Sequence, residues 1–296
     1  MLEVAFTPVA PYRLAQSIGP PDATRRARGG VLDMVYPVVT GGTALARVWQ
    51  GGDGRLHARI DADDDAAAHD RLRAILGVGL DTREFLRMAA SDPLLAPLAP
   101  RLRGLRPMRV STPAHALLRA LCGQLVRTSD AVRFERRLIG TLGRPERGLR
   151  MAPDAATLAS AHPAVIERAG LSPRRAVVLT RAARRLNLDA LATDPGARAV
   201  ARITREPGLG PWTAGVLMVY GYGRHDQGLV GDLALVRLAE ALGVESDVEL
   251  VEPYGPWQGL ASIWLMHHPV GARRTRLRAA GIRAGAGHGG PQGAPR

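Results

Sequence analysis

The residues best suited to chemistry lie in the segment Arg205–Ala214, which contains Pro207-Gly208-Leu209-Gly210-Pro211, and at Asp232 downstream. The two glycines allow backbone angles that other residues avoid, and Pro211 suits the first turn of a helix. The pattern predicts a tight hairpin that opens a helix, whose outward backbone N–H groups can bind phosphate. Asp232 precedes an apolar run, which predicts a carboxylate at the start of a second helix. A phosphate-binding backbone beside a carboxylate is what an enzyme that cleaves a bond within DNA requires.

The stretch Pro207–Ala214, with Asp232 at the matching spacing, resembles the helix-hairpin-helix DNA glycosylase superfamily, and within it the bacterial 3-methyladenine DNA glycosylase II type. The resemblance runs from about Thr112 to Ile282 and, more weakly, through the first 110 residues. It implies a mainly α fold, with a helical glycosylase domain preceded by a small α+β domain that holds an antiparallel sheet. It also implies that Asp232 is catalytic: a carboxylate stabilises an oxocarbenium-like sugar and orients or deprotonates the attacking water. A helix N-cap role for Asp232 is compatible with this chemistry.

The resemblance also implies how the hairpin meets DNA. The hairpin residues Pro207, Gly208, Leu209 and Gly210, together with Thr213, would hold the DNA backbone without reading sequence. In the family, hairpin carbonyls also hold a monovalent cation, Na⁺ or K⁺, which bridges to phosphate. The matching carbonyls here belong to Thr204, Glu206 and Leu209. Glu206 departs from the family, which has an apolar residue there, and its carboxylate would either repel phosphate or point to solvent.

A base-excision enzyme needs a pocket for a flipped base and a side chain that fills the gap. By resemblance, Trp264 stacks on the base and Trp212 lies on the pocket wall, where an aromatic face attracts cationic alkylated purines. Val216 replaces a family aromatic, so the pocket should be less aromatic. Leu125 would be the DNA wedge, and Gln124 would bond the opposite or flanking base. The alternatives are that Trp264 and Leu125 are core residues and that Gln124 is an ordinary polar helix position.

The charge balance favours a DNA partner. The chain has 296 residues, a net charge of +13 and a pI of about 11.3. All 40 basic residues are arginine, which a G+C-rich genome would also produce. Trp212 stands where lyase-competent relatives carry a catalytic lysine, and a Schiff-base lyase needs an amine. We therefore expect the reaction to stop at base removal.

The single cysteine, Cys122, excludes a four-cysteine iron–sulfur cluster, so no cofactor is expected beyond the hairpin cation. The adjacent His267 and His268 lack a metal-ligand spacing. The chain has neither a signal-peptide pattern nor an apolar run of membrane-spanning length. These features predict a monomeric bacterial cytoplasmic protein that acts on double-stranded DNA with damaged bases, away from membranes.

The domains expected are an α+β domain at 1–110, the glycosylase domain at 111–282 and a disordered basic tail at 283–296. Alternation predicts strands at 31–39, 43–50 and 55–61. Helices are expected at 66–76 and 82–90, the second begun by a capping box at Asp81–Glu84. Helical patterns continue at 113–127, 129–142, 154–161, 163–169, 173–186, 195–205, 211–222, 232–242 and 256–267. The five arginines of helix 173–186 form either a solvated face or a contact to the DNA backbone.

These features favour a monofunctional glycosylase that excises alkylated bases, chiefly 3-methyladenine and also 7-methylguanine. Two alternatives stay open. The same fold could act on hypoxanthine, uracil or an oxidised purine, or the protein could be a non-catalytic DNA-binding lesion sensor. The carboxylate of Asp232 argues against a sensor, because a binding protein has no use for a carboxylate that faces the sugar.

Overall fold

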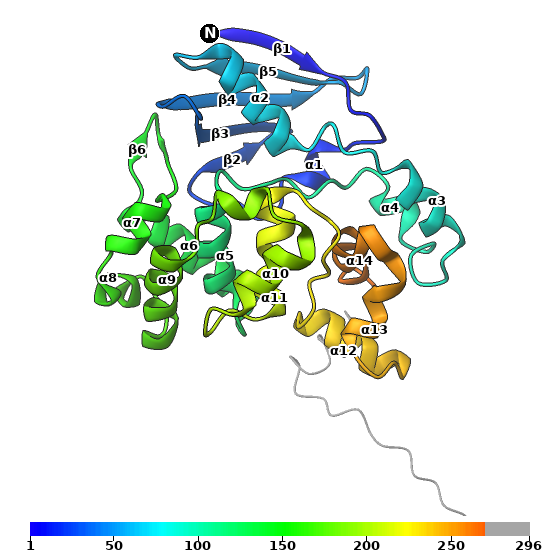
Figure 1. The fold of residues 1–296 in the computed structure, drawn as a ribbon. Coiled ribbons are helices and arrows are strands. Elements are labelled where there is room, and N and C mark those ends of the chain that lie inside the picture. The colour runs from blue at the N-terminus through cyan, green and yellow to red at the C-terminus, as the bar shows by residue number, and fades with distance from the viewer. Residues whose placement is uncertain (270–296) are drawn as a thin grey trace, which may run out of the picture.

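The computed structural model describes residues 1–269, so the tail expected at 283–296 and the predicted domain end at 282 lie outside the described residues. The chain begins with an antiparallel sheet and continues as a larger helical part below it (Figure 1). This confirms the expected fold class. In the described part, no helix is both long and apolar enough to cross a lipid bilayer.

The sheet has five strands in the order β1-β5-β4-β3-β2, with every neighbouring pair antiparallel. The helix α2 (Asp65–Leu76) covers one face, and side chains that alternate along the central strands point toward it, as the period of two predicts. Two strands of this sheet were missed in the sequence: β1 at the chain start and β2, whose sequence Arg-Arg-Ala-Arg hides its pairing with β3. The strands are β1 (Leu2–Phe6), β2 (Arg25–Arg28), β3 (Val31–Pro37), β4 (Thr43–Gln50) and β5 (Leu56–Asp61).

The helical part is built around α5 (Pro113–Gly123), which packs against α6, α9, α11 and a π-helical turn. That turn, Leu217–Tyr222, continues α11 directly. The short hairpin β6 (Pro145–Glu146) and β7 (Leu149–Arg150) projects toward the sheet (Figure 1). The other α-helices are α1 (Leu14–Ser17), α3 (Arg83–Ser91), α4 (Ala99–Leu102), α6 (Thr128–Leu142), α7 (Ala155–Ser160), α8 (Pro163–Arg168), α9 (Pro173–Arg185), α10 (Gly196–Thr204), α11 (Pro211–Val216), α12 (Leu233–Leu242), α13 (Asp247–Val251) and α14 (Gln258–Leu265).

Two details differ from the sequence prediction. The helix expected at 113–127 ends at Gly123, because Gln124 is extended (ψ 118°) and Leu125 has a positive φ of 53°. The capping box expected at Asp81–Glu84 does not form. Thr82 makes no side-chain cap bond, and Asp81 instead accepts a hydrogen bond from the backbone N–H of Arg83 at 3.0 Å.

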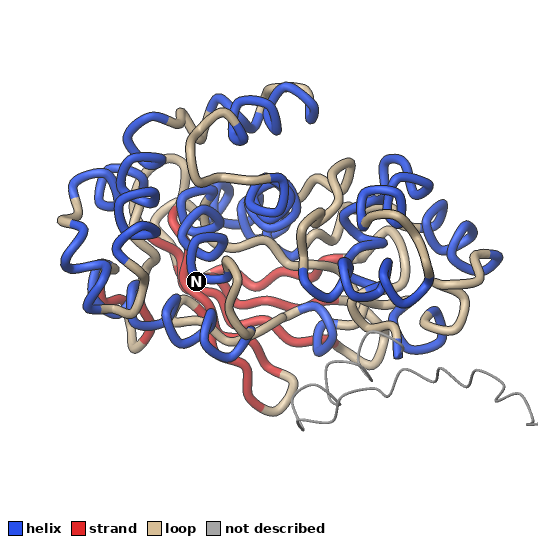
Figure 2. Tube along the Cα trace, turned by 90° about the horizontal axis from the view of Figure 1, so that it is seen from below, coloured by secondary structure: helices blue, strands red, loops and turns tan. Residues whose placement is uncertain are grey.

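The buried apolar side chains form two separate cores. One lies between the sheet and α2, and the other fills the helical part. Figure 2, viewed from below, shows the helices arranged along the sheet. Phe85 and Leu95 precede the expected boundary at residue 110 but belong to the second core. The helical core therefore recruits α3 and the segment after it, and it supports the elements that carry the site.

Candidate functional site: a cleft beside the glycine hairpin

A cleft of about 1150 Å³ opens between the end of α5, the start of α9, the glycine hairpin and the start of α12. Leu125, Trp212 and Asp232 all line it, together with Gln124 and the hairpin glycines Gly208 and Gly210. Its basic lining comes from Arg127, Arg174, Arg175 and Arg237. The structure therefore brings most of the predicted site residues together from segments that are far apart in the sequence.

Asp232 is the N-cap of α12 and is held at both carboxylate oxygens. Oδ1 accepts a hydrogen bond from the backbone N–H of Ala234 at 2.8 Å, and Oδ2 accepts one from Nε1 of Trp212 at 3.1 Å. The preceding loop is also fixed, because Asp247 accepts from the N–H of Gly231 and Ser262 accepts from the N–H of Leu229. A carboxylate oxygen can accept more than one hydrogen bond, so this half-buried group keeps capacity for a water molecule or a positive charge in the cleft.

Trp212 forms a wall of the cleft and is confined from behind. A Cβ atom added at Gly123 would lie 2.7 Å from Cη2 of the indole, so only glycine leaves room for the ring there. The close approach keeps the indole edge turned toward Asp232, to which it donates its N–H. Trp212 therefore combines two properties: it offers an aromatic surface to the cleft and fixes the carboxylate.

Leu125 is 86% exposed and has a φ of 53°, a backbone conformation that residues other than glycine rarely adopt. The alternative that Leu125 is a core residue is therefore wrong. A large apolar side chain held out into solvent, on a strained backbone at the rim of a cleft, is a feature for which folding alone gives no reason. Such a side chain is suited to insertion into a base stack.

The side chains of Gln124 and Thr213 are hydrogen-bonded to each other beside the hairpin. The side-chain nitrogen of Gln124 donates to the carbonyl of Gly208 at 3.1 Å and to the hydroxyl of Thr213 at 3.2 Å. Gln124 thus ties the end of α5 to the hairpin, and this nitrogen is not directed at a base. Thr213 is 1% exposed, so its side chain is buried beside the hairpin although the residue lines the cleft.

The structure contradicts the predicted base-stacking position of Trp264. Its side chain is 1% exposed, lies in the helical core and packs edge-on against Phe85, with ring centroids 5.0 Å apart. It does not line the cleft. The apolar pattern of α14 fits a helix buried on all sides, and that burial takes Trp264 away from the site. Trp212 is consequently the aromatic side chain of the cleft wall.

The hairpin follows α10 and is anchored by Leu209, which is 4% exposed, while Pro207 and Gly208 face solvent. Gly208 has a φ of 89°, and an added Cβ would lie 2.7 Å from Val178 of α9. Both the backbone angle and the close approach thus require glycine. This geometry explains the motif locally: the turn is tight because α9 lies directly against it.

Glu206 does not point to solvent, so that expectation is wrong, and its charge is paired with arginines of α9. Its carboxylate is buried and accepts a hydrogen bond from Nε of Arg181 at 2.7 Å, and Nε of Arg185 lies 3.4 Å away. The departure from the family at this position is therefore compensated by arginines on α9. Burial of a charge is tolerated when it is paired and hydrogen-bonded in this way.

Two contacts at the hairpin work against a monovalent cation on the predicted carbonyls of Thr204, Glu206 and Leu209. The carbonyl of Glu206 already accepts the N–H of Leu209 at 3.0 Å. The adjacent carbonyl of Pro207 accepts a hydrogen bond from the guanidinium of Arg181, which places a positive charge beside these oxygens. A bound Na⁺ or K⁺ would be repelled by that guanidinium.

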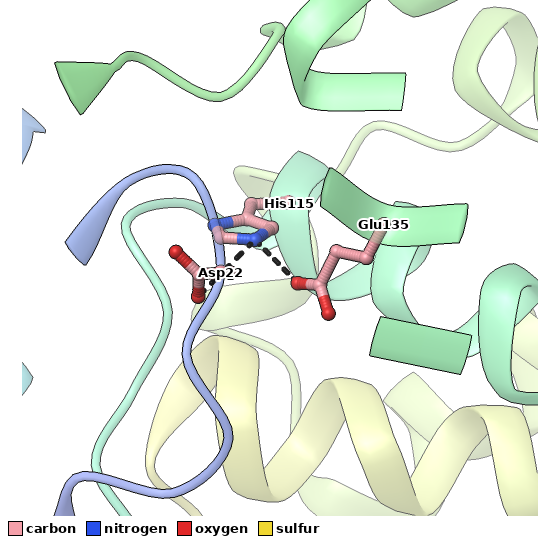
Figure 3. Close-up of side chains that lie close together, drawn as sticks. All are labelled: Asp22, His115 and Glu135. Carbon is pink, nitrogen blue, oxygen red and sulfur yellow. Dashed lines mark hydrogen bonds and ion pairs between the residues drawn. The ribbon is translucent and has the colours of Figure 1, made fainter. Parts of the chain in front are cut away.

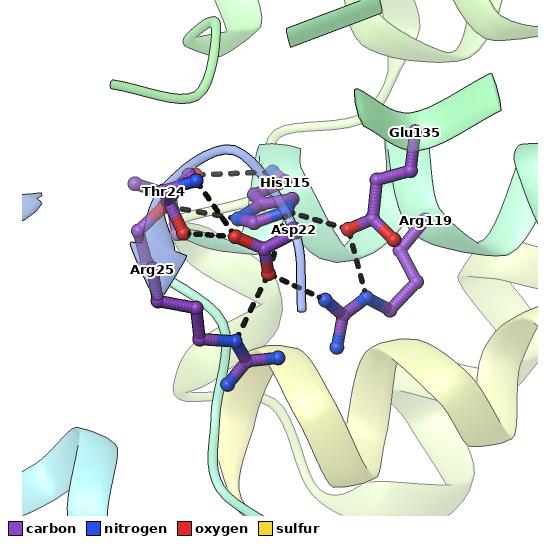
Figure 4. Close-up of polar contacts among 8 residues, drawn as sticks. Asp22, Thr24, Arg25, His115, Arg119 and Glu135 are labelled. Carbon is purple, nitrogen blue, oxygen red and sulfur yellow. Dashed lines mark hydrogen bonds and ion pairs between the residues drawn. The ribbon is translucent and has the colours of Figure 1, made fainter. Parts of the chain in front are cut away.

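A buried ion-pair network joins the sheet to the helical part (Figure 4). The carboxylate of Asp22 lies 3.1 Å from Nε of Arg25 and accepts a hydrogen bond from Arg119 at 2.8 Å. Arg119 also donates to Glu135 at 2.9 Å, and His115 lies 2.7 Å from the same carboxylate. Burial alone would raise the pKa of Asp22, but the positive charges of Arg25 and Arg119 outweigh it and lower the pKa. Sequence reasoning missed this network because its members are distant in the chain.

Asp22, His115 and Glu135 offer one ligand atom each within 4.8 Å of one another (Figure 3). These side chains do not fit a metal ion, because arginine guanidinium groups already bind both carboxylates. The cluster instead forms a buried ion-pair network between the start of the chain and helices α5 and α6. The guanidinium of Arg119 lies 5.9 Å from the ring centre of Tyr220. Burial, opposed by Arg119 and reinforced by the negative charge of Asp232, raises the pKa of Tyr220.

Comparisons with known proteins agree with this architecture. No protein-family model matches the sequence. A curated Mycobacterium tuberculosis protein, described as a probable bifunctional transcriptional activator/DNA repair enzyme AlkA, is 27% identical over 227 residues. The match covers 71% of this chain and 45% of that protein, so this chain spans less than half the length of the curated relative it matches.

Two solved structures share the fold over almost their whole length. The 3-methyladenine DNA-glycosylase from Archaeoglobus fulgidus has a TM-score of 0.77 at 18% identity, covering 90% of this chain and 97% of that one. An 8-oxoguanine glycosylase/lyase from Clostridium acetobutylicum has a TM-score of 0.72 at 16% identity, covering 90% and 96%. The chain is thus similar in sequence to a protein described as a DNA repair enzyme, and it shares its fold with these DNA glycosylase structures.

Proposed function

We propose that the protein is a DNA glycosylase that hydrolyses the N-glycosidic bond of alkylated bases, chiefly 3-methyladenine and also 7-methylguanine, in duplex DNA. The observation that carries the proposal is the carboxylate of Asp232, fixed by Trp212 in a cleft with the exposed Leu125 at its rim. The curated relative described as a DNA repair enzyme and the 3-methyladenine glycosylase with the same fold support it.

In the proposed reaction the damaged nucleotide leaves the base stack and enters the cleft, and Leu125 fills the vacated space. The alkylated base stacks against Trp212, and its positive charge is attracted by the aromatic face. As the glycosidic bond breaks, positive charge develops on the sugar. Asp232 stabilises this charge and orients the attacking water, or removes its proton.

We further propose that the enzyme has no lyase activity. A lyase of this kind forms a Schiff base between an amine and the sugar. The sequence contains no lysine. By resemblance to the family, Trp212 stands where lyase-competent relatives carry one. Cation–π attraction at Trp212 favours alkylated, positively charged bases over neutral lesions such as 8-oxoguanine, hypoxanthine and uracil.

The proposal is tested on a panel of duplexes that each carry one lesion. We expect alkali-sensitive abasic sites at 3-methyladenine and 7-methylguanine, few at neutral lesions, and no strand breaks before alkali treatment. Asp232→Asn is the matched control, because asparagine keeps the helix cap and removes the charge. Excision of 8-oxoguanine in preference to the alkylated bases would reassign the substrate. DNA binding without excision by the wild-type protein would favour the lesion-sensor alternative.

A further inference from the structure

Glu206 is buried although it directly precedes two exposed hairpin residues. Its side chain is 6% exposed, whereas Pro207 and Gly208 face solvent. Arg181 and Arg185 of α9 lie on either oxygen of the carboxylate, at 2.7 and 3.4 Å. The two arginines and the one carboxylate together carry a net charge of +1, which is held in a fixed position at the hairpin.

Arg181 contacts the hairpin backbone as well as Glu206. Its Nε donates to the carboxylate, and its Nη2 donates to the carbonyl of Pro207. A planar guanidinium held at two points has its third nitrogen, Nη1, set in direction. Among residues 1–269, Nη1 makes no hydrogen bond, and the side chain is 33% exposed. Arg185 is 65% exposed beside it. Both can therefore reach a phosphate without first losing their internal contacts.

These arginines continue a basic stripe that starts in the cleft. Arg174, Val178, Arg181 and Arg185 follow the spacing of a single helix face. Arg174 lines the cleft, and Val178 packs against Gly208. Arg184 departs from this stripe, because its Nε donates to the carbonyl of Ala159 at 2.6 Å, away from the hairpin.

We propose that Arg181 and Arg185, oriented by Glu206, bind phosphates of the DNA backbone beside the hairpin and supply the positive charge that a hairpin-bound monovalent cation would otherwise supply. The proposal rests on the proposed function only in taking duplex DNA as the ligand. It explains why a carboxylate is placed at residue 206: Glu206 holds Arg181 against the carbonyl of Pro207 and fixes where the charge lies.

The test measures the affinity for an undamaged duplex as a function of salt, for three variants. Arg181→Gln with Glu206→Gln removes one positive and one negative charge, so the net charge equals that of the wild type. Arg184→Gln is the matched control, because it lowers the net charge from the same helix away from the hairpin. Arg185→Gln tests the second arginine alone. Thermal melting of each variant establishes that it is folded.

Each phosphate contact contributes about 0.9 to the slope of log affinity against log salt. We expect the paired variant and Arg185→Gln each to reduce the magnitude of the slope by about 0.9, and to weaken binding about eightfold at 0.1 M salt. Arg184→Gln should leave the slope near that of the wild type. Replacing K⁺ by tetramethylammonium at constant ionic strength should leave the wild-type affinity unchanged.

Three results would overturn the proposal. These are a paired variant that keeps the wild-type slope, an Arg184→Gln slope that falls as much as that of Arg185→Gln, and an affinity that depends on K⁺. Any of these, found while the wild type excises alkylated bases, removes this inference and leaves the proposed function intact. A wild-type protein that does not bind duplex DNA would remove both.

Discussion

Replacing Trp212 by phenylalanine separates the two properties that the structure gives this side chain. Phenylalanine keeps an aromatic face toward the cleft but cannot donate to Oδ2 of Asp232, which accepts from Nε1 at 3.1 Å. A hydrogen bond to a charged group contributes about 1.5–3 kcal/mol, and 1.4 kcal/mol is a factor of ten. If that bond holds the carboxylate in its reactive position, single-turnover excision should slow by about 10- to 150-fold.

The assay compares the single-turnover rate constant with the dissociation constant for lesion DNA, for one cationic and one neutral base. Loss of the hydrogen bond should lower the rate by a similar factor for both bases, whereas loss of stacking should weaken mainly the cationic one. Trp257→Phe is the matched control, because Nε1 of Trp257 is buried and has no hydrogen-bond partner in the described structure. A Trp212→Phe rate within twofold of the wild-type rate would refute the positioning role.

Four further predictions follow from the same geometry. Asp232→Asn should change the free energy of unfolding by less than about 1 kcal/mol, because asparagine caps helices as well, while excision falls by orders of magnitude and lesion binding persists; near-normal excision would remove Asp232 from catalysis. Leu125→Ala should leave the melting temperature within a degree or two, since an exposed side chain contributes about 0.5 kcal/mol or less, yet weaken flipping of every lesion, as 2-aminopurine fluorescence can report. Gly208→Ala should lower both stability and DNA affinity, because the φ of 89° and Val178 both exclude a Cβ, and unchanged melting and binding would contradict this. The lowered pKa values of Asp22 and Glu135 stabilise the fold above the unfolded pKa values, about 4, and this contribution declines as the pH falls below them toward the folded pKa values; in urea unfolding the stability difference between wild type and Asp22→Asn should therefore narrow progressively below about pH 4, and a constant difference would count against the network.

The sequence predicted those features that depend on short-range patterns. Strand β4 and helix α2 follow from alternation and helical periodicity, and the hairpin and the N-cap at Asp232 follow from glycine and capping chemistry. The base-stacking role of Trp264 came from the family resemblance, and it failed because a matching position in the sequence does not say whether the side chain meets a core or a cleft. Its contact with Phe85 joins segments far apart in the chain.

Charged residues show the same limit more strongly. Judged from its sequence neighbours alone, a glutamate beside a phosphate-binding turn is expected to repel the phosphate. The structure reverses this reading, because Arg181 and Arg185 approach Glu206 from a different helix. The hydrogen-bonded ion pair between Asp22 and Arg119 likewise joins the segment before β2 to α5, and no local sequence pattern predicts it. Tertiary pairing decides what such charges do, and it is not encoded in spacing.

The backbone at Leu125 sets stability against the proposed insertion of this side chain into DNA. The left-handed backbone conformation destabilises the protein by roughly 1 kcal/mol with leucine relative to glycine. Because Leu125 is 86% exposed, its side chain contributes almost no packing energy to offset this. A screen that selects only for thermal stability should therefore enrich Leu125→Gly, which removes the proposed wedge side chain. A thermostabilised variant should therefore keep Leu125 and gain its stability from substitutions at other positions.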